Sequence, residues 1–324
     1  MNRKSLFFLC LAVIGAYLIY QFLASGFNWS LFLSSVRNIQ SGWLAASVAA
    51  TLLTYVVRAL RWQVLLNPLK SVPLGPLIST NVLGFSAIYV FGRPGELVRP
   101  VWLSRSERIP LTASFATIIV ERVLDLLMLI ALFGLALQIV ELPPTTQHTL
   151  AWMKSKAWVI VGGSALTMLF LFVFRSKIDR IISYVPFEKI RDLLKKFSAG
   201  LSFLDETRSF GLAILHTFVV WMVIVLQFWF MLLAMNFRFS VSAATLVMVL
   251  TAIGSVAQIP GIGGGFQLAF AFCMTTFFLV PPEQAAAASL IAWVSSYIPT
   301  VLAGIYYMVS RGVSLKDLRT VPAE

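Results

Sequence analysis

Long runs of hydrophobic residues recur along the chain, separated by short segments rich in charged residues, proline and glycine. A helix needs about 20 apolar residues to cross the hydrocarbon layer of a bilayer. The pattern therefore predicts an all-α polytopic membrane protein with about six full transmembrane helices. The predicted spans are Ser5–Ala24, Trp43–Leu60, Leu111–Val140, Ala157–Phe174, Phe210–Met235 and Ala286–Val309.

Two further hydrophobic stretches, Leu74–Phe91 and Val241–Val280, are not simple spans, and the second is broken by "IPGIGGGFQ". Basic residues in short loops mark the cytoplasmic side of a membrane protein. If both stretches enter the membrane and return to the same side, 20 of the 25 basic residues are cytoplasmic, 4 lie outside, and Arg122 lies within a span. We therefore predict two re-entrant segments and place both termini in the cytoplasm.

The two re-entrant segments enter from opposite faces, so the order span, re-entrant segment, span occurs twice with opposite polarity. We predict one membrane domain, residues 1–324, with inverted halves at about 41–141 and 210–309. Residues 175–209 join the halves and carry eight basic and five acidic side chains. This segment is either a basic amphipathic helix pair on the cytoplasmic membrane surface or a solvated linker.

Composition supports a membrane protein and argues against several other classes. Of 324 residues, 59% are hydrophobic and 12% are charged, which is more apolar surface than a soluble domain can hide. The net charge of +12 is spread over short loops, so it indicates topology signals and no nucleic-acid partner. Two cysteines and two histidines without clustered partners predict no disulfide framework, metal site or cofactor. The first hydrophobic run is long for a signal peptide, so we expect it to be retained.

The decapeptide "FGRPGELVRP", residues 91–100, interrupts a hydrophobic run with charge and helix breakers. Irregular backbone at membrane depth persists only where protein or water surrounds it. Gly92 permits a sharp turn, and Pro94 favours the start of a short helix whose first turn contains Glu96. Pro100 is expected to limit this helix, because its ring disfavours helical geometry at Arg99.

Arginines near that helix start predict an anion site, and phosphate is the commonest membrane anion. The candidate headgroup ligands here are Arg93, Glu96 and Arg99, with Asn81 on the polar route beside them. Alternatively, this segment is a cytoplasmic loop whose arginines only fix topology. Arg58 and Arg61, one helical turn apart, are either snorkelling anchors or further headgroup contacts.

Two other clusters stand out within hydrophobic segments. The run "IPGIGGGFQLAF" is either a second backbone site for a headgroup or a place where helices pack closely, and its candidate residues are Gly261, Gly263, Gly264 and Gln267. The run "VERVLDLL" places Glu121, Arg122 and Asp125 near mid-membrane, with Arg122 reaching Asp125 one turn on. Such charges either form a structural ion pair or serve proton coupling or headgroup recognition.

In order along the chain, "RALRWQVLL", Asn81, "FGRPGELVRPVWL", "ERVLD" and "PGIGGGFQ" resemble the lysylphosphatidylglycerol synthase transmembrane-region family, also called the flippase-like domain family. The resemblance extends from about Ser41 to Val309. It implies a membrane domain related to lipid flippases, with paired re-entrant helices. Members with two domains continue into a soluble aminoacyl-transferase domain, which we do not expect here because the chain ends at Glu324. The family often has an acidic residue where this chain has Gln267.

Together these features predict a protein without enzymatic activity that binds and translocates an anionic phospholipid or glycolipid in the plasma (inner) membrane of a prokaryote. A membrane-embedded transferase acting on a lipid carrier is the alternative from another class, with Glu96, Glu121 or Asp125 as its base. An accessory subunit of an envelope pathway is a third. A homo-oligomer or an enzyme of the same pathway is the expected protein partner.

Overall fold

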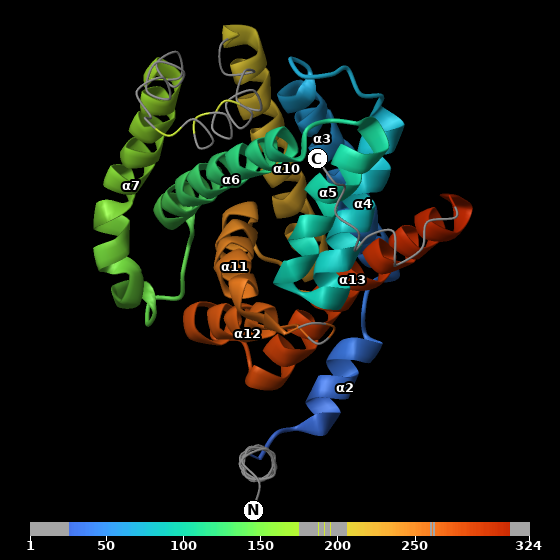
Figure 1. Cartoon of the computed structure of the whole chain (residues 1–324). Helices are drawn as coiled ribbons and strands as arrows, with labels where there is room; N and C mark the ends of the chain where they lie inside the picture. The colour runs from blue at the N-terminus through green and yellow to red at the C-terminus, as the bar shows by residue number, and fades with distance from the viewer. Residues whose placement is uncertain are drawn as a thin grey trace, which may run out of the picture.

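The computed structural model describes residues 26–174, 187, 191, 195, 206–259, 261 and 263–311, and these are almost entirely helical (Figure 1). The predicted all-α membrane class is confirmed. Four of the described helices are long and apolar enough to cross a bilayer: Ser41–Leu66, Leu74–Phe91, Thr207–Ala234 and Pro282–Ser310. The predicted first span, Ser5–Ala24, and most of the segment 175–209 lie outside the described residues.

The helices follow one another with short connections. They are α2 (Trp29–Arg37), α3 (Ser41–Leu66), α4 (Leu74–Phe91), α5 (Val98–Glu107), α6 (Leu111–Ile139), α7 (Gln147–Phe174), α10 (Thr207–Ala234), α11 (Val241–Gly254), α12 (Gly265–Phe278) and α13 (Pro282–Arg311). Two 3-10 turns, η1 (Arg93–Leu97) and η4 (Ser255–Ala257), and two short strands, β1 (Gln258–Ile259) and β2 (Gly263–Gly264), occupy the breaks. Five predicted spans correspond to α3, α6, α7, α10 and α13, whereas the count of six remains a prediction.

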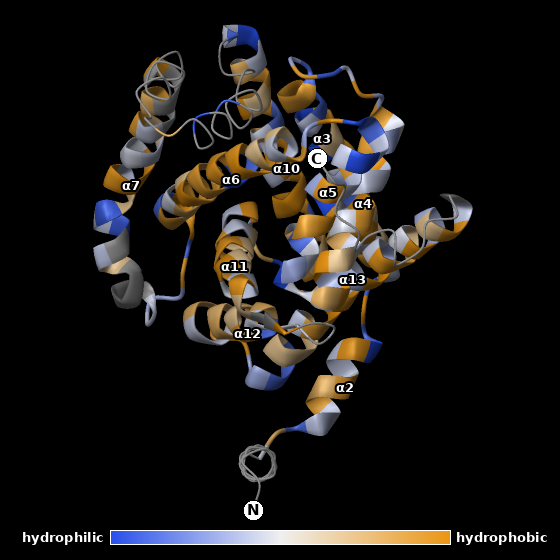
Figure 2. Cartoon of the chain, viewed as in Figure 1, coloured by the Kyte–Doolittle hydropathy of each residue, from blue (hydrophilic) through white to orange (hydrophobic). Residues whose placement is uncertain are grey.

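Hydrophobic residues predominate along most of the helices (Figure 2). Large apolar residues with more than half of their surface exposed include Leu126 on α6, Leu268 on α12 and Leu302 on α13. Such surfaces are unfavourable in water and favourable against lipid chains. The main core lies between α6, α10, α11, α12 and α13, where fully buried alanines such as Ala244 and Ala288 let the helices approach closely.

Helices α3 and α10 pack side by side in opposite directions. The amide of Gln40, just before α3, donates to the Ala234 carbonyl at the end of α10 over 2.9 Å. Further along the pair, the Ser47 hydroxyl donates to the Gln227 carbonyl over 3.0 Å. The start of α3 therefore lies beside the end of α10, which defines the two ends of the helix bundle.

The first predicted re-entrant segment is a hairpin made of α4 and α5. Helix α4 is continuous over Leu74–Phe91, and the chain reverses at Gly92, whose φ of 71° favours glycine. The ends of the hairpin meet where Lys70 Nζ lies 3.0 Å from Glu107 Oε2. The return to the starting side was expected within Leu74–Phe91, but residues after Gly92 form it.

The second limb of this hairpin also differs from the expectation for Pro100. Helix α5 runs through Pro100 to Glu107. Proline is tolerated there because it stands in the first turn, where its missing N–H has no helical partner in any case. Pro100 therefore does not limit the helix.

The second predicted re-entrant segment is the hairpin of α11 and α12. Each helix has 14 residues, which at about 1.5 Å per residue is too short to cross the bilayer. At the base of the hairpin, the rings of Phe239 and Phe278 stack with centroids 4.8 Å apart. At its tip, β1 and β2 pair antiparallel, with Gln258 opposite Gly264 and Ile259 opposite Gly263.

The two hairpins start from opposite ends of the α3–α10 pair and meet at their tips. The Gly261 amide of one tip donates to the Tyr89 carbonyl of the other over 3.1 Å. Arg93 Nη2 donates to the Ser255 carbonyl over 3.1 Å. This contact satisfies backbone groups that lipid cannot. The division into inverted halves at 41–141 and 210–309 remains a prediction.

Cysteine labelling tests the first hairpin. In a chain with Cys10 and Cys273 replaced by alanine, Ser71→Cys and Ser106→Cys should react with an impermeant reagent from the same face of the membrane. Arg238→Cys, in the loop after α10, should react from the other face. Reaction at positions 71 and 106 from opposite faces would show that Leu74–Phe91 is a full span.

Gly95 tests the tight turn between the limbs. A Cβ atom at this position would lie 2.3 Å from the Ala87 carbonyl carbon, and backbone cannot move aside easily. Gly95→Ala should therefore lower the free energy of unfolding in detergent by about 1–3 kcal/mol. Gly75→Ala, where a Cβ meets nothing within 4 Å, is the matched control. Equal stability of the two variants would contradict the close approach.

Candidate functional site

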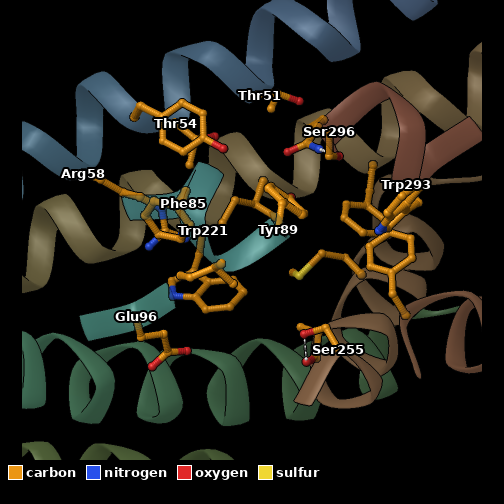
Figure 3. A pocket seen from close by; sticks show the side chains of 18 of the residues that line it. Thr51, Thr54, Arg58, Phe85, Tyr89, Glu96, Trp221, Ser255, Trp293 and Ser296 are labelled. Atoms are coloured by element: carbon orange, nitrogen blue, oxygen red, sulfur yellow. Dashed lines mark hydrogen bonds between the residues drawn. The ribbon is translucent and has the colours of Figure 1, made fainter. Parts of the chain in front are cut away.

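A cavity of about 250 Å³ lies where the two hairpin tips meet α3, α6, α10 and α13. The side chains that line it include an aromatic group and a charged group. Aromatic residues line much of the wall: Tyr55, Phe85, Tyr89, Trp221, Phe228, Phe266 and Trp293. Charged residues form the rest of one side: Arg58, Arg93, Glu96 and Arg122. In Figure 3, Arg58 and Glu96 lie toward one side of the space, whereas Trp293 and Ser296 lie toward the other. The cavity is therefore amphipathic.

Two buried carboxylates on α6 adjoin this charged side. Glu121 and Asp125 lie one helical turn apart and are 0% and 7% exposed. Arg99 of α5 binds Glu121 through both terminal nitrogens, each at 3.0 Å. Arg61 of α3 holds Asp125 through both terminal nitrogens, at 2.5 and 3.3 Å. These two arginines tie α3, α5 and α6 together at a depth where unpaired charge is costly.

This arrangement adds a closer partner for Asp125 than the one expected. Arg122, the partner expected from its spacing along α6, does reach Asp125 Oδ2, at 3.7 Å. Arg61 binds the same carboxylate more closely from another helix, and it also lies 2.8 Å from Glu121. Trp221 Nε1 adds a hydrogen bond to Asp125 at 3.2 Å. The partner from another helix is therefore closer to Asp125 than the partner that the i, i+3 spacing predicts.

Two arginines remain at the cavity without a carboxylate of their own. Arg58 Nη1 lies 3.8 Å from both Glu121 and Asp125, and it makes no hydrogen bond to any described residue. Arg122 Nη2 donates to Glu121 at 3.1 Å, but its side chain is 41% exposed. Four guanidinium groups therefore surround two carboxylates, and the formal excess of two positive charges lies on the cavity side.

Aromatic rings support the buried guanidinium groups. Phe85 lies between Arg58 and Arg99, whose central carbons are 4.8 and 5.3 Å from its centroid. Arg99 also lies over Trp62 at 4.7 Å. Gly84 makes room for this arrangement, since a Cβ there would overlap the Arg99 side chain. Cation–π attraction offsets part of the desolvation cost of the buried cations.

Arg93 lines the cavity but binds the second hairpin. Its guanidinium lies 2.6 Å from Glu96 Oε1 and donates to the carbonyls of Ser255 and Val256, at 3.1 and 3.5 Å. The predicted anion site at the helix start is therefore built differently, because Arg93 faces the carbonyl end of α11. Its side chain is still 44% exposed.

The other predicted site residues hold structure around the cavity. Arg61 and Arg99 bind the carboxylates through their terminal nitrogens, the buried Nε of each has no hydrogen-bond partner among the described residues, and neither residue lines the cavity. Asn81 is completely buried in α4, and its side-chain amide makes no hydrogen bond within the described part of the chain.

In the glycine run, Gly264 N–H donates to Gln267 Oε1 over 2.7 Å, which caps α12. Gly261 links the tips, and Gly263 belongs to β2.

Sequence reasoning missed the aromatic and neutral polar part of the wall. Trp293 and Tyr297 stack at 4.4 Å, and Tyr89 meets Tyr297 edge-on at 5.4 Å. Gln227 donates to the Ser296 hydroxyl over 2.8 Å. Each of these residues stands in an apolar helix with no local signal of function. The spacing of Trp293 and Tyr297 at i, i+4 was the one available hint.

The ion pairs generate a stability prediction. Arg61→Leu removes the closest partner of Asp125 and leaves it with Arg58 and Arg122 at 3.8 and 3.7 Å, and breaking a buried pair typically costs about 3–5 kcal/mol. Replacing both residues by leucine removes the pair as a unit, so the double variant should lose less stability in detergent than the sum of the two single variants. Arg122→Leu, at the more exposed guanidinium, should have a smaller effect than Arg61→Leu. A double variant that loses the sum of both single effects would show that the two charges are not coupled.

Comparisons with known proteins agree with a membrane protein. The sequence matches the family described as "Lysylphosphatidylglycerol synthase TM region" over residues 7–304. It is similar to "UPF0104 membrane protein MJ1595" of Methanocaldococcus jannaschii, with 24% identity over 67% of this chain and 68% of the relative. It is also similar to "Glycosyltransferase AglD" of Haloferax volcanii, with 26% identity over 83% of this chain but only half of that relative. No solved structure matches. The chain belongs to the lysylphosphatidylglycerol synthase TM region family.

Proposed function

We propose that this protein binds an anionic lipid headgroup in the cavity between the hairpin tips and translocates that lipid across the membrane. The observation that carries the proposal is the charge balance at the cavity, where Arg58 and Arg122 exceed the available carboxylates. A charge excess at membrane depth is costly to maintain, and an anion bound in the cavity would neutralise it.

The position of the cavity supports translocation as well as binding. The hairpins reach it from opposite ends of the α3–α10 pair, and α11 and α12 are too short to cross alone. A headgroup can therefore meet polar groups at a depth where lipid offers none. Polar backbone at the tips, at Ser255 and Gly261, extends this path beyond the cavity. The acyl chains would stay beside the apolar outer faces.

The proposal includes the plasma membrane of a prokaryote, with both termini in the cytoplasm, and no chemical change of the lipid. Both relatives compared above come from archaea, and one is named a membrane protein. The proposed partners are anionic phospholipids or glycolipids. A homo-oligomer or an enzyme of an envelope pathway is the proposed protein partner.

A membrane-embedded transferase is the second candidate, favoured by the similarity to a protein named a glycosyltransferase. That similarity covers half of the relative's length, so its activity is carried over only as a proposal. Vesicles with labelled lipids distinguish the two classes. Redistribution of an unmodified lipid between leaflets supports translocation, whereas a chemically changed lipid supports the transferase.

Charge-neutral substitutions at the cavity test the binding site. In nanodiscs of phosphatidylcholine, Arg58→Gln should weaken binding of labelled phosphatidylglycerol by about tenfold, because a nearby charge in a partly buried site contributes more than 1 kcal/mol. Arg122→Gln should weaken binding less, since its guanidinium is 41% exposed and screened by solvent. Glu96→Gln should strengthen binding, because it removes the carboxylate that pairs with Arg93.

Arg238→Gln is the matched control. It removes the same charge from an exposed loop before α11, away from the cavity residues. If Arg58→Gln and Arg238→Gln bind phosphatidylglycerol equally well, the buried arginines serve structure alone and the proposed site is wrong.

A further inference from the structure

We infer that the preferred headgroup carries two negative charges on its phosphate group, as a lipid phosphomonoester or diphosphate does. A phosphodiester such as phosphatidylglycerol carries one. This inference rests on the proposed function and narrows the class of lipid that the cavity takes.

Two of the four positive charges around the carboxylates are already cancelled. Arg99 and Glu121 form one pair, and Arg61 and Asp125 form another, each with two contacts between guanidinium and carboxylate. Both pairs are buried, and neither pair has a net charge. The excess is therefore two, and a monoanion would still leave one positive charge beside the cavity without an anionic partner.

The two excess charges are close enough for one headgroup to reach both. Arg58 Nη1 lies 3.8 Å from Asp125 Oδ2, and Arg122 Nη2 lies 3.7 Å from the same oxygen. Both side chains line the cavity. A single phosphate group, with its several oxygens, can accept hydrogen bonds from two guanidinium groups on neighbouring helices.

Two hydrogen-bond donors on residues that line the cavity have no acceptor among the described residues. Arg58 Nη1 and Trp293 Nε1 are buried atoms of cavity-lining residues, and neither has a partner among the described residues. An unsatisfied buried donor is unfavourable. A phosphomonoester has more charged oxygens to satisfy such donors than a phosphodiester has.

Protonation of the ligand gives a direct test, because the second pKa of a phosphomonoester is about 6. The protein's own titratable or charged groups near the pair come from several elements: Tyr55 and Arg61 of α3, Tyr89 of α4, Arg93 and Glu96 of η1, Arg99 of α5, and Glu121 and Asp125 of α6. Phosphatidylglycerol keeps one charge above and below this pKa, so its binding reports any titration of these groups.

The experiment compares three lipids with identical acyl chains in nanodiscs, namely phosphatidic acid, phosphatidylglycerol and phosphatidylcholine. Well above the phosphate pKa, phosphatidic acid should bind the wild-type protein about tenfold more tightly than phosphatidylglycerol. Well below that pKa, the preference should disappear while phosphatidylglycerol binding stays unchanged. Arg58→Gln should reduce the preference, and Arg238→Gln should keep it. The wild-type comparison stands even if Arg58→Gln fails to fold.

The outcomes separate this inference from the proposed function. Equal binding of phosphatidic acid and phosphatidylglycerol, with both above phosphatidylcholine, overturns the two-charge inference and leaves the anionic-lipid proposal intact. Binding of neither above phosphatidylcholine overturns both. Glycerol 3-phosphate, which has the headgroup without acyl chains, is a final competitor. If it competes as well as phosphatidic acid, the ligand is a soluble phosphomonoester, and the lipid part of the inference is wrong.

Discussion

The structure depends on two carboxylates that cannot be left unpaired at membrane depth. Glu121 and Asp125 stand on α6, while their closest partners, Arg99 and Arg61, come from α5 and α3. Removing one member strands a buried charge, so the network favours one relative placement of three helices. This placement positions the first hairpin, because α5 is its returning limb. Such a network specifies an arrangement more than it adds net stability, since desolvation offsets much of the attraction.

The same constraint on polar groups explains why the hairpins meet. Each reverses inside the bundle and exposes backbone groups that lipid cannot satisfy. Contacts between the tips supply partners: the Gly261 amide reaches the Tyr89 carbonyl, and Arg93 reaches the last carbonyls around α11. The irregular segments at which the chain turns back are therefore also the segments through which the two hairpins contact each other. The contact between the tips also gives the cavity part of its polar lining. Arg93 and Ser255 form a hydrogen bond between the tips, and both residues line the cavity.

Much of this architecture could be predicted from local sequence patterns. Hydrophobic runs predicted the helices α3, α6, α7, α10 and α13, because the length of such a run depends on the residues of that segment alone. The decapeptide at residues 91–100 and the glycine run at 259–267 identified both hairpin tips. Partners across helices could not be predicted this way. Arg61 looked like an interfacial anchor, yet it is fully buried against Asp125, because α6 provides a carboxylate at the same depth. The aromatic wall was missed for the same reason.

Charge in this chain has two separable functions, which a count along the sequence cannot distinguish. Basic residues in loops bias topology through their number and side, so one of them can be lost with little effect. The four guanidinium groups around Glu121 and Asp125 differ from these loop residues. Whether the charge of each is cancelled depends on which carboxylate it contacts. Once Arg61 and Arg99 are assigned to their carboxylates, Arg58 and Arg122 are left facing the cavity. Partial exposure of Arg122 and the Phe85 ring beside Arg58 reduce the cost of these two charges without cancelling them. A fold that keeps such an excess next to a cavity retains an electrostatic preference for anions, whatever the rest of the headgroup contributes.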